Sequence, residues 1–169
     1  MLIDLYPDLI KILLIIVLLI CSALISGSEV AFFSLSKSDL KKISSSNVKN
    51  LKLIALLRSN PRRLLATLLV SNNFINISIV LLLASFGQLF DLVFLPNWLN
   101  FVLEVGFITA LILLFGEILP KVYANRKPIS FSKKMAFPVQ FIDKYLFFFI
   151  TIPMSKMTKF IQDKLVFKK

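Results

Sequence analysis

The stretch LFGEILPKVYANRKP, from Leu114 to Pro128, decides the fold, because an apolar run ends there in a carboxylate, a proline and a cluster of positive charge. Glu117 lies near hydrocarbon, where a carboxylate is costly and usually lines a pathway or holds a partner. Pro120 has no backbone N–H, so the carbonyl of Gly116, four residues earlier, loses its normal helical hydrogen bond. A carboxylate beside a carbonyl that lacks its helical hydrogen bond is a candidate cation-binding site.

The composition indicates a membrane protein rather than a soluble one. The chain has 169 residues, of which 57% are hydrophobic, and its mean hydropathy is +0.84. Its formal charge is nonetheless +11. Apolar spans joined by basic loops combine these two properties, whereas a nucleic-acid-binding module interleaves its charge with a polar surface. The expected partner is therefore a lipid bilayer and not nucleic acid.

The cysteine and histidine content narrows the chemistry. Cys21 is the single cysteine, so the chain cannot form an internal disulfide, and it has no histidine. Neither a structural zinc site nor a histidine-based catalytic triad can be built from such a set. No nucleophile–base pair can be named either, so we do not expect an enzyme.

Three segments are long enough to span a bilayer, which takes about 20 apolar residues of helix. They run from about Leu9 to Phe33, from about Leu64 to Ala84 and from about Trp98 to Leu119. The loops after the first and third spans are basic, whereas the loop between the second and third has only Asp91 as a charged residue. The excess of cytoplasmic positive charge seen in membrane proteins then predicts an outer N-terminus and an inner C-terminus.

Further helices are expected on the cytoplasmic side, which completes an all-α integral membrane fold. Between Lys37 and Arg58, a Ser/Asn-rich turn separates two helical stretches and predicts a helical hairpin. After the third span, aromatic residues recur three or four apart among lysines: Phe137, Phe141, Tyr145 and Phe148. This pattern favours juxtamembrane amphipathic helices, lying in the headgroup layer or against the bundle. We therefore divide the chain into a transmembrane domain, 1–137, and an amphipathic basic tail, 138–169.

Polar side chains recur inside all three spans. Ser22 and Ser26 lie one turn apart on the first span, and Asn72 and Asn76 lie one turn apart on the second. In antiparallel spans, Ser26, Asn72 and Glu117 all fall in the cytoplasmic half of the bilayer. Hydroxyl, amide and carboxylate oxygens are the ligands that hard cations such as Mg²⁺ and Na⁺ take. Ser and Asn also serve as hydrogen-bonding glue between membrane helices, so each of them alone favours glue.

Other residues of the spans keep two interpretations. Glu29 either joins the serine stripe or reaches the cytoplasmic interface. Glu104 lies nearer the outer half of the bilayer. There it either hydrogen-bonds to a neighbouring helix or lines an outer vestibule, and the sequence supports both roles equally. Gly106 and Ala110 are small residues four apart, which permits close helix approach. They predict a dimer contact, with packing inside one subunit as the alternative.

Three motifs together resemble the transmembrane domain of the CNNM/CorC family: SGSEVAFFSLSK at 26–37, LLVSNNFIN at 68–76 and FGEILPKVYANRKP at 115–128. The resemblance implies a homodimer, multi-pass in the cell (inner) membrane, that exports magnesium, with Na⁺ as the candidate coupling ion and Mg²⁺ as the cargo. It also implies a metal site and a helix break. The implied metal ligands are Ser26, Asn72 and Glu117, with Ser28, Asn76 and the backbone of Gly116 beside them, and the helix break is at Pro120 and Lys121.

The chain departs from the family pattern in two ways. Ser71 stands where many members have glycine before the asparagine, which adds a candidate ligand. The cytoplasmic CBS domains that sense nucleotide are absent from it, so we expect a truncated form or the membrane part of a longer protein, without nucleotide regulation of its own. The alternative to transport is a non-transporting membrane anchor, assembly or regulatory module of a haemolysin-like protein.

Overall fold

The described residues form a purely helical structure. The computed structural model describes residues 2–46, 48–85 and 96–146, and every regular element within them is a helix. The predicted all-α fold is therefore confirmed. Residues 147–169, which include Phe148 and most of the predicted basic tail, lie outside the described part.

Within the described part of the chain, three helices are long and apolar enough to span a membrane. The first is α1, Leu2–Phe33, and the second is α4, Pro61–Ala84. The third runs continuously over Asn97–Arg126 and is made of α5 (Asn97–Leu111), the π-helical segment η1 (Ile112–Ile118) and α6 (Leu119–Arg126). The three predicted spans are confirmed, although the third extends beyond its predicted end.

Local sequence explains the start of α4. Pro61 occupies the first turn, where its missing N–H costs nothing and its fixed φ suits a helix. Asn60 precedes it, and the Asn60 side-chain oxygen accepts a hydrogen bond from the backbone N–H of Arg63 at 3.2 Å. This cap satisfies one of the donors that every helix start leaves open.

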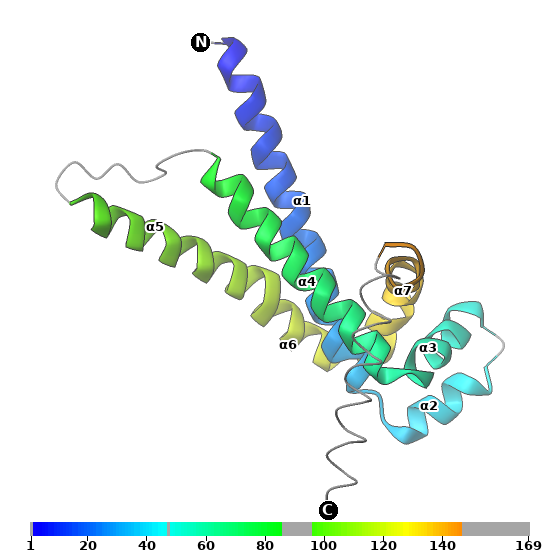
Figure 1. The fold of residues 1–169 in the computed structure, drawn as a ribbon. Coiled ribbons are helices and arrows are strands. Elements are labelled where there is room, and N and C mark those ends of the chain that lie inside the picture. Colours follow the sequence, from blue (N-terminus) through cyan, green and yellow to red (C-terminus); the bar gives the residue numbers. More distant parts are fainter. Residues whose placement is uncertain (1, 47, 86–95, 147–169) are drawn as a thin grey trace, which may run out of the picture.

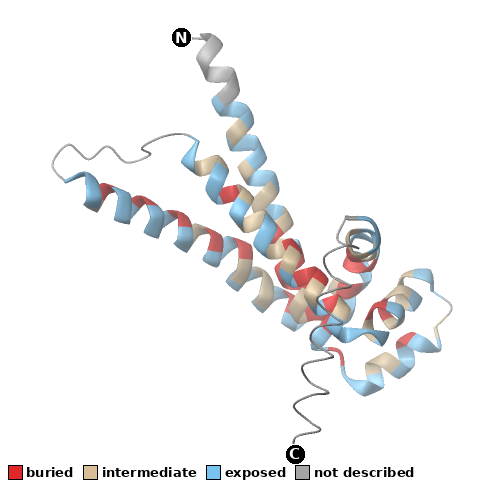
Figure 2. Cartoon of the chain, viewed as in Figure 1, coloured by how far each residue is buried: buried red, intermediate tan, exposed pale blue. Residues whose placement is uncertain are grey.

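The long helices converge at one end of the molecule and diverge toward the other (Figure 1). Helix α1 packs against α4, η1, α6 and α7, and it runs antiparallel to α4. Buried residues gather at the converged end, whereas the far part of α5 has one buried face and is otherwise exposed (Figure 2). The exposed apolar side chains on these helices match a surface that faces lipid rather than water.

The predicted hairpin is confirmed at the converged end as α2, Lys37–Ser44, and α3, Lys49–Ser59. Helix α2 begins with a capping box, in which Ser36 accepts from the N–H of Asp39 at 3.1 Å and the Asp39 carboxylate accepts from the N–H of Ser36 at 3.1 Å. Ile54 is fully buried in an apolar core shared with the ends of α1 and α4 and with α7. This core attaches the hairpin to the membrane helices.

Helix α7, Pro128–Phe141, continues into the π-helical segment η2, Ile142–Leu146. It uses one face for packing, because Met135, Ala136 and Val139 are buried in the same apolar core. Its exposed aromatic residues are Phe137, Phe141 and Tyr145. The helix therefore packs against the bundle and also presents an aromatic face. The predicted domain boundary between 137 and 138 falls within α7, and that division stays a prediction.

Candidate cation site between the three long helices

Each long helix contributes polar side chains to one cluster at the level where α1, α4 and η1 meet. Ser22 comes from α1, Asn72 and Asn76 come from successive turns of α4, and Glu117 comes from η1. Ser22 is fully buried, and the other three side chains are half-buried. We call these four residues the central cluster.

The carboxylate of the central cluster accepts hydrogen bonds from two amides. Asn72 Nδ2 donates to Glu117 Oε1 at 3.1 Å, and Asn76 Nδ2 donates to the same oxygen at 2.9 Å. Both donors are neutral, so they orient the carboxylate without cancelling its charge. No ion pair to Glu117 occurs among the described residues.

The two amide oxygens point the other way, toward Ser22. The Ser22 hydroxyl lies 2.8 Å from Asn76 Oδ1 and 3.2 Å from Asn72 Oδ1. A hydroxyl has a single proton, so it donates to one of these oxygens at a time. The other amide oxygen then meets the lone pairs of Ser22, which makes this corner of the cluster rich in electron density. Such a corner is suited to a cation.

Two glycines allow α1 to approach the third helix this closely. A Cβ on Gly116 would lie 2.9 Å from Ser22 Oγ, and a Cβ on Gly27 would lie 2.7 Å from the Phe131 ring and 3.3 Å from the Pro120 carbonyl oxygen. Contacts that short require neighbouring atoms to move. Helix α1 continues through Gly27 without a break. The function of Gly27 is to let another helix approach.

The other predicted serine ligands lie near the central cluster but make different contacts. Ser26 is buried, and its hydroxyl has no hydrogen-bond partner among the described residues. Ser28 donates to the Leu24 carbonyl of its own helix at 2.6 Å. Ser71 likewise donates to the Thr67 carbonyl at 2.6 Å. The structure thus joins Asn72, Asn76 and Glu117 to Ser22 through hydrogen bonds, and the role of Ser26 as a cation ligand stays a prediction.

The predicted helix break at Pro120 takes the form of a change in helix type. The preceding seven residues, Ile112–Ile118, are π-helical, and α6 begins at Leu119 with Pro120 in its first turn. A π-helical turn bonds residues five apart and thus accommodates a position that cannot donate four residues back. The chain therefore stays helical through Pro120, with Glu117 inside the wider turn.

Charged residues near the cluster are paired with one another. Lys121 Nζ lies 3.3 Å from Glu29 Oε2, and both side chains are about one-third exposed. This contact links α1 to α6, and both interpretations of Glu29 stay predictions. Glu104 is buried on the inner face of α5, one turn from Ile108. It lies 13 residues before Glu117 on the same continuous helix, so it belongs to a different level.

The predicted dimer residues face away from the described bundle. A Cβ on Gly106 would meet no atom within 4 Å, and Ala110 is exposed. Packing inside one subunit, the alternative interpretation of these small residues, is therefore not what the structure shows. Their role in a dimer stays a prediction.

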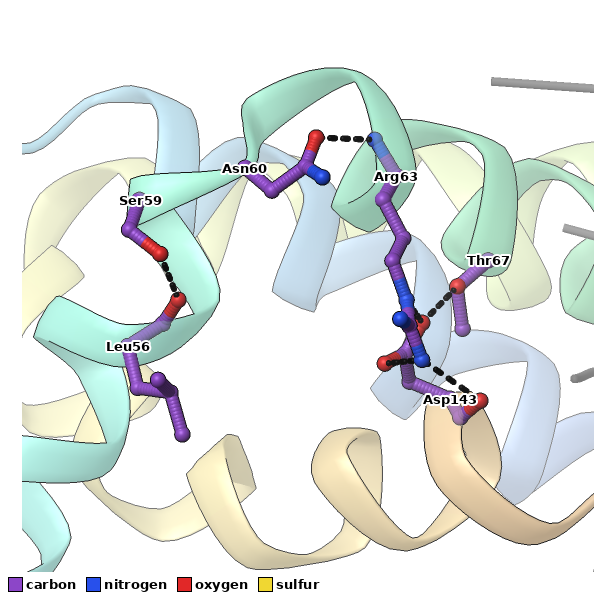
Figure 3. A network of polar contacts seen from close by, with 6 residues as sticks. All are labelled: Leu56, Ser59, Asn60, Arg63, Thr67 and Asp143. Atoms are coloured by element: carbon purple, nitrogen blue, oxygen red, sulfur yellow. Dashed lines mark hydrogen bonds and ion pairs between the residues drawn. The ribbon is translucent and has the colours of Figure 1, made fainter. Parts of the chain in front are cut away.

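A second polar network, which the sequence does not predict, joins α4 to η2 (Figure 3). Asp143 of η2 accepts from Arg63 Nε at 2.9 Å and from Thr67 Oγ1 at 2.6 Å, and its other carboxylate oxygen lies 2.7 Å from an Arg63 terminal nitrogen. We call these three residues the terminal clamp. The signal in the sequence is weak, because Asp143 follows Thr67 by 76 residues.

Ser22 lies on the same face of the first span as Ser26, and the sequence alone does not show which of the two hydrogen-bonds the asparagines. Depth arithmetic places a residue along a helix to within about a turn, and Ser22 and Ser26 differ by one turn. Among the described residues, no group of three or more His, Cys, Asp or Glu side chains is arranged to hold a metal. A cation in the central cluster would therefore depend on one carboxylate and on neutral oxygens.

A family model described as the cyclin M transmembrane N-terminal domain (CNNM) matches residues 13–167. The chain is similar to UPF0053 protein sll1254 of Synechocystis sp., with 30% identity over 130 residues, covering 76% of this chain and 36% of that protein. It is also similar to Metal transporter cnnm-4 of Caenorhabditis elegans, with 31% identity over 125 residues, covering 71% of this chain and 26% of that protein.

A third relative is UPF0053 inner membrane protein YfjD of Escherichia coli (strain K12). It is 28% identical over 121 residues, which cover 72% of this chain and 26% of that protein. The chain thus spans about a quarter to a third of the length of these relatives.

Proposed function

Because the chain belongs to the family of cyclin M transmembrane N-terminal domains, we propose that it moves Mg²⁺ across a membrane. One relative, from Caenorhabditis elegans, is named a metal transporter. The observation that carries the proposal is the Glu117 carboxylate, which three helices surround with neutral oxygen-bearing side chains and which has no cationic partner among the described residues. A transported cation would supply the missing charge.

The oxygen chemistry of the central cluster suits magnesium. Mg²⁺ keeps several of its waters and binds through one or two carboxylates, so a single Glu117 is sufficient. The waters can bond to neutral oxygens such as Asn72 Oδ1 and Ser22 Oγ. Rotating an asparagine amide by half a turn exchanges its oxygen and nitrogen. A cation beside Glu117 would repel the amide N–H groups and would favour that rotation, which brings two further oxygens toward the ion.

We propose efflux coupled to Na⁺ entry, in the direction that the family resemblance implies. A single carboxylate neutralises Na⁺ fully and leaves Mg²⁺ with one excess positive charge, so the same position can hold either ion in turn. The ions exchange places and no covalent bond is formed or broken. Nucleotide control would belong to CBS domains and not to these residues.

The proposed orientation places the hairpin in the cytoplasm and the N-terminus outside, in the inner membrane of the cell. The basic residues of α2 and α3 support it, and the name of the Escherichia coli relative supports the membrane. Ser45, at the end of α2, is exposed and suits labelling. With Cys21 replaced by Ala, a Ser45→Cys variant should resist a membrane-impermeant thiol reagent in sealed cells and react after lysis. Reaction of Ser45→Cys in sealed cells would contradict the proposed orientation.

We further propose a homodimer in which the outward-facing Gly106 and Ala110 meet the second copy. The open space around Gly106 supports this arrangement, because small residues allow close contact between membrane helices. A Gly106→Leu dimer should therefore dissociate at a higher protein concentration than the dimer of the unmodified chain, as measured by mass photometry in detergent. A chain that is monomeric in both detergent and lipid nanodiscs would rule out the dimer.

A non-transporting anchor or assembly module is the second candidate. It is favoured by the hydrogen bonding of the central cluster, since Asn72, Asn76 and Glu117 satisfy one another as interhelical glue would. The two functions differ in what they require of Glu117. Glue requires only an acceptor, which glutamine also provides, whereas cation transport requires the negative charge.

Magnesium flux in proteoliposomes tests the proposal. Glu117→Gln should lower the flux by about 100-fold, which is the upper end of the loss caused by mutating a side chain that surrounds a metal site. The fold should be unchanged. Glu104→Gln is the matched control, because it removes a buried carboxylate from the same helix at another level. Flux in Glu117→Gln equal to that in the control would leave the anchor function as the better account.

A further inference from the structure

A basic pocket lies inside the helical hairpin, away from the central cluster. It has a volume of about 440 Å³, and it is lined by Lys37, Leu40, Lys41, Ser44, Ala55, Arg58 and Ser59. The lining contains three cationic side chains and no carboxylate. Ligand pockets in proteins have volumes of this order.

The spacing of the lining residues shows that the pocket belongs to the facing surfaces of both helices. On α2 they fall at Lys37, Leu40, Lys41 and Ser44, which share one helix face. On α3 the lining residues are Ala55, Arg58 and Ser59, which lie within about one helical turn. Asp39 lies two residues from Lys37, on the opposite side of α2, where it caps the helix with Ser36.

The position of Arg58 is set by the end of the first membrane helix. Its guanidinium carbon lies 4.8 Å from the centre of the Phe33 ring, a cation–π contact. Arg58 Nε is buried and has no hydrogen-bond partner among the described residues. Phe33 therefore holds the cation beside Lys37 and Lys41 without neutralising it. Three like charges brought together in this way repel one another and favour an anion between them.

The location of the hairpin indicates which anions lie close to the basic pocket. Helix α2 begins four residues after α1 ends, and α3 ends two residues before α4 begins. Both neighbours are long and apolar enough to span a membrane, so the hairpin lies beside their ends (Figure 1). Phospholipid headgroups occupy that level of a bilayer. Their phosphates are fixed in place, whereas free phosphate must come from solution.

We propose that this pocket binds a phosphate group and that an anionic phospholipid presents it. The three cations contact the phosphate oxygens, while Leu40 and Ala55 contact the apolar part of the headgroup region. Bound lipid would hold the hairpin against the bilayer next to the end of α1. This inference does not depend on transport, because none of its residues belongs to the central cluster.

Lipid retention by the full chain tests the pocket. The chain in detergent would be titrated with phosphatidylglycerol or phosphatidylcholine, and retained lipid would be counted by native mass spectrometry. Each basic residue near an anionic headgroup contributes about fivefold. The double variant Lys41→Gln/Arg58→Gln should therefore lose about thirtyfold of its preference for phosphatidylglycerol. The double variant Lys42→Gln/Lys49→Gln removes the same charge from exposed positions outside the lining and should change the preference less than about threefold.

The remaining arms identify the source of the phosphate. Calorimetric titration with inorganic phosphate should show weak binding that disappears in Lys41→Gln/Arg58→Gln. Tight binding of inorganic phosphate without any preference for phosphatidylglycerol would overturn the lipid assignment. Equal losses in the two double variants, with helicity by circular dichroism unchanged, would show diffuse attraction to charge and would overturn the pocket.

Discussion

The central cluster and the terminal clamp both use a carboxylate to join α4 to another part of the chain, and they differ in charge. In the clamp, Asp143 faces the Arg63 guanidinium, so the two charges cancel within the protein. In the central cluster, the partners of Glu117 within the described part of the chain are the amides of Asn72 and Asn76. The difference teaches that hydrogen-bond satisfaction and charge balance are separate properties. The clamp has both, whereas the cluster has the first and shows no countercharge among the described residues, which supports the proposed cation site.

The largest difference between the two networks should appear in stability. Asp143→Asn leaves the Arg63 guanidinium without its carboxylate, which should lower the free energy of unfolding by about 2–4 kcal/mol. The lower part of that range is expected, because the Arg63 side chain is 29% exposed. Glu117→Gln keeps an acceptor for both asparagine amides and should cost less than about 1 kcal/mol.

Reversible unfolding in detergent, followed by circular dichroism, measures both free energies. The comparison then predicts opposite outcomes for the two carboxylates, with Asp143 needed for stability and Glu117 for flux. Equal losses of stability in the two variants would mean that the central cluster also depends on its charge for folding, and the distinction would fail.

A smaller effect is expected from a methyl group added at the edge of the central cluster. Gly116→Ala places a Cβ 2.9 Å from Ser22 Oγ, and overpacking of this kind costs about 1–3 kcal/mol. It should also displace Ser22 and lower magnesium flux. Gly106→Ala is the matched control on the same helix, because its Cβ meets no atom within 4 Å inside the subunit and because alanine is itself small enough for the close helix contact of the proposed dimer.

The control variant should be neutral or up to about 1 kcal/mol more stable, since alanine is the better helix former. Thermal unfolding in detergent and flux in proteoliposomes would be measured for both variants. A Gly116→Ala protein as stable and active as the Gly106→Ala protein would show that the close contact with Ser22 has no energetic consequence.

The smallest effect should come from a third carboxylate, outside both networks. Hydrogen bonds from the Ser36 side chain and backbone lower the pKa of Asp39, and Lys42 adds to this. A lowered pKa in the folded state means that the capping contribution is present above the ordinary Asp value, about 3.9, and is lost as the pH falls through the folded value. Fraying of α2 in acid, followed by NMR of the Asp39 carboxyl, should therefore begin only below that ordinary value. A titration at or above it would contradict the cap.

The membrane helices could be predicted from the sequence because their signal is local. Hydropathy over about 20 residues identifies a span without knowledge of its neighbours, and Glu117 stands out because charge is rare there. The paired asparagines of the second span could be identified for the same reason. The hairpin followed from turn residues between Ser44 and Lys49. Each of these features is contained in a single segment.

The contacts between segments could not be predicted in the same way. Which serine hydrogen-bonds the asparagines depends on how α1 crosses η1, and that crossing depends on the short distance that Gly116 allows. The terminal clamp depends on the return of η2 to α4. Both are set by packing geometry between distant residues, on which hydropathy and helix periodicity carry no information.

The π-helical segment also makes the winding of the third helix a constraint in its own right. Each residue of an α-helix turns the chain by about 100°, and a π-helical turn takes up about one residue more than an α-helical turn. Winding the same residues, Ile112–Ile118, as an ordinary α-helix would therefore rotate everything that follows by about that angle relative to α5. Glu117 would then face away from Asn72 and Asn76, with its chemistry unchanged. The type of helix, rather than side-chain identity, decides the direction of the carboxylate.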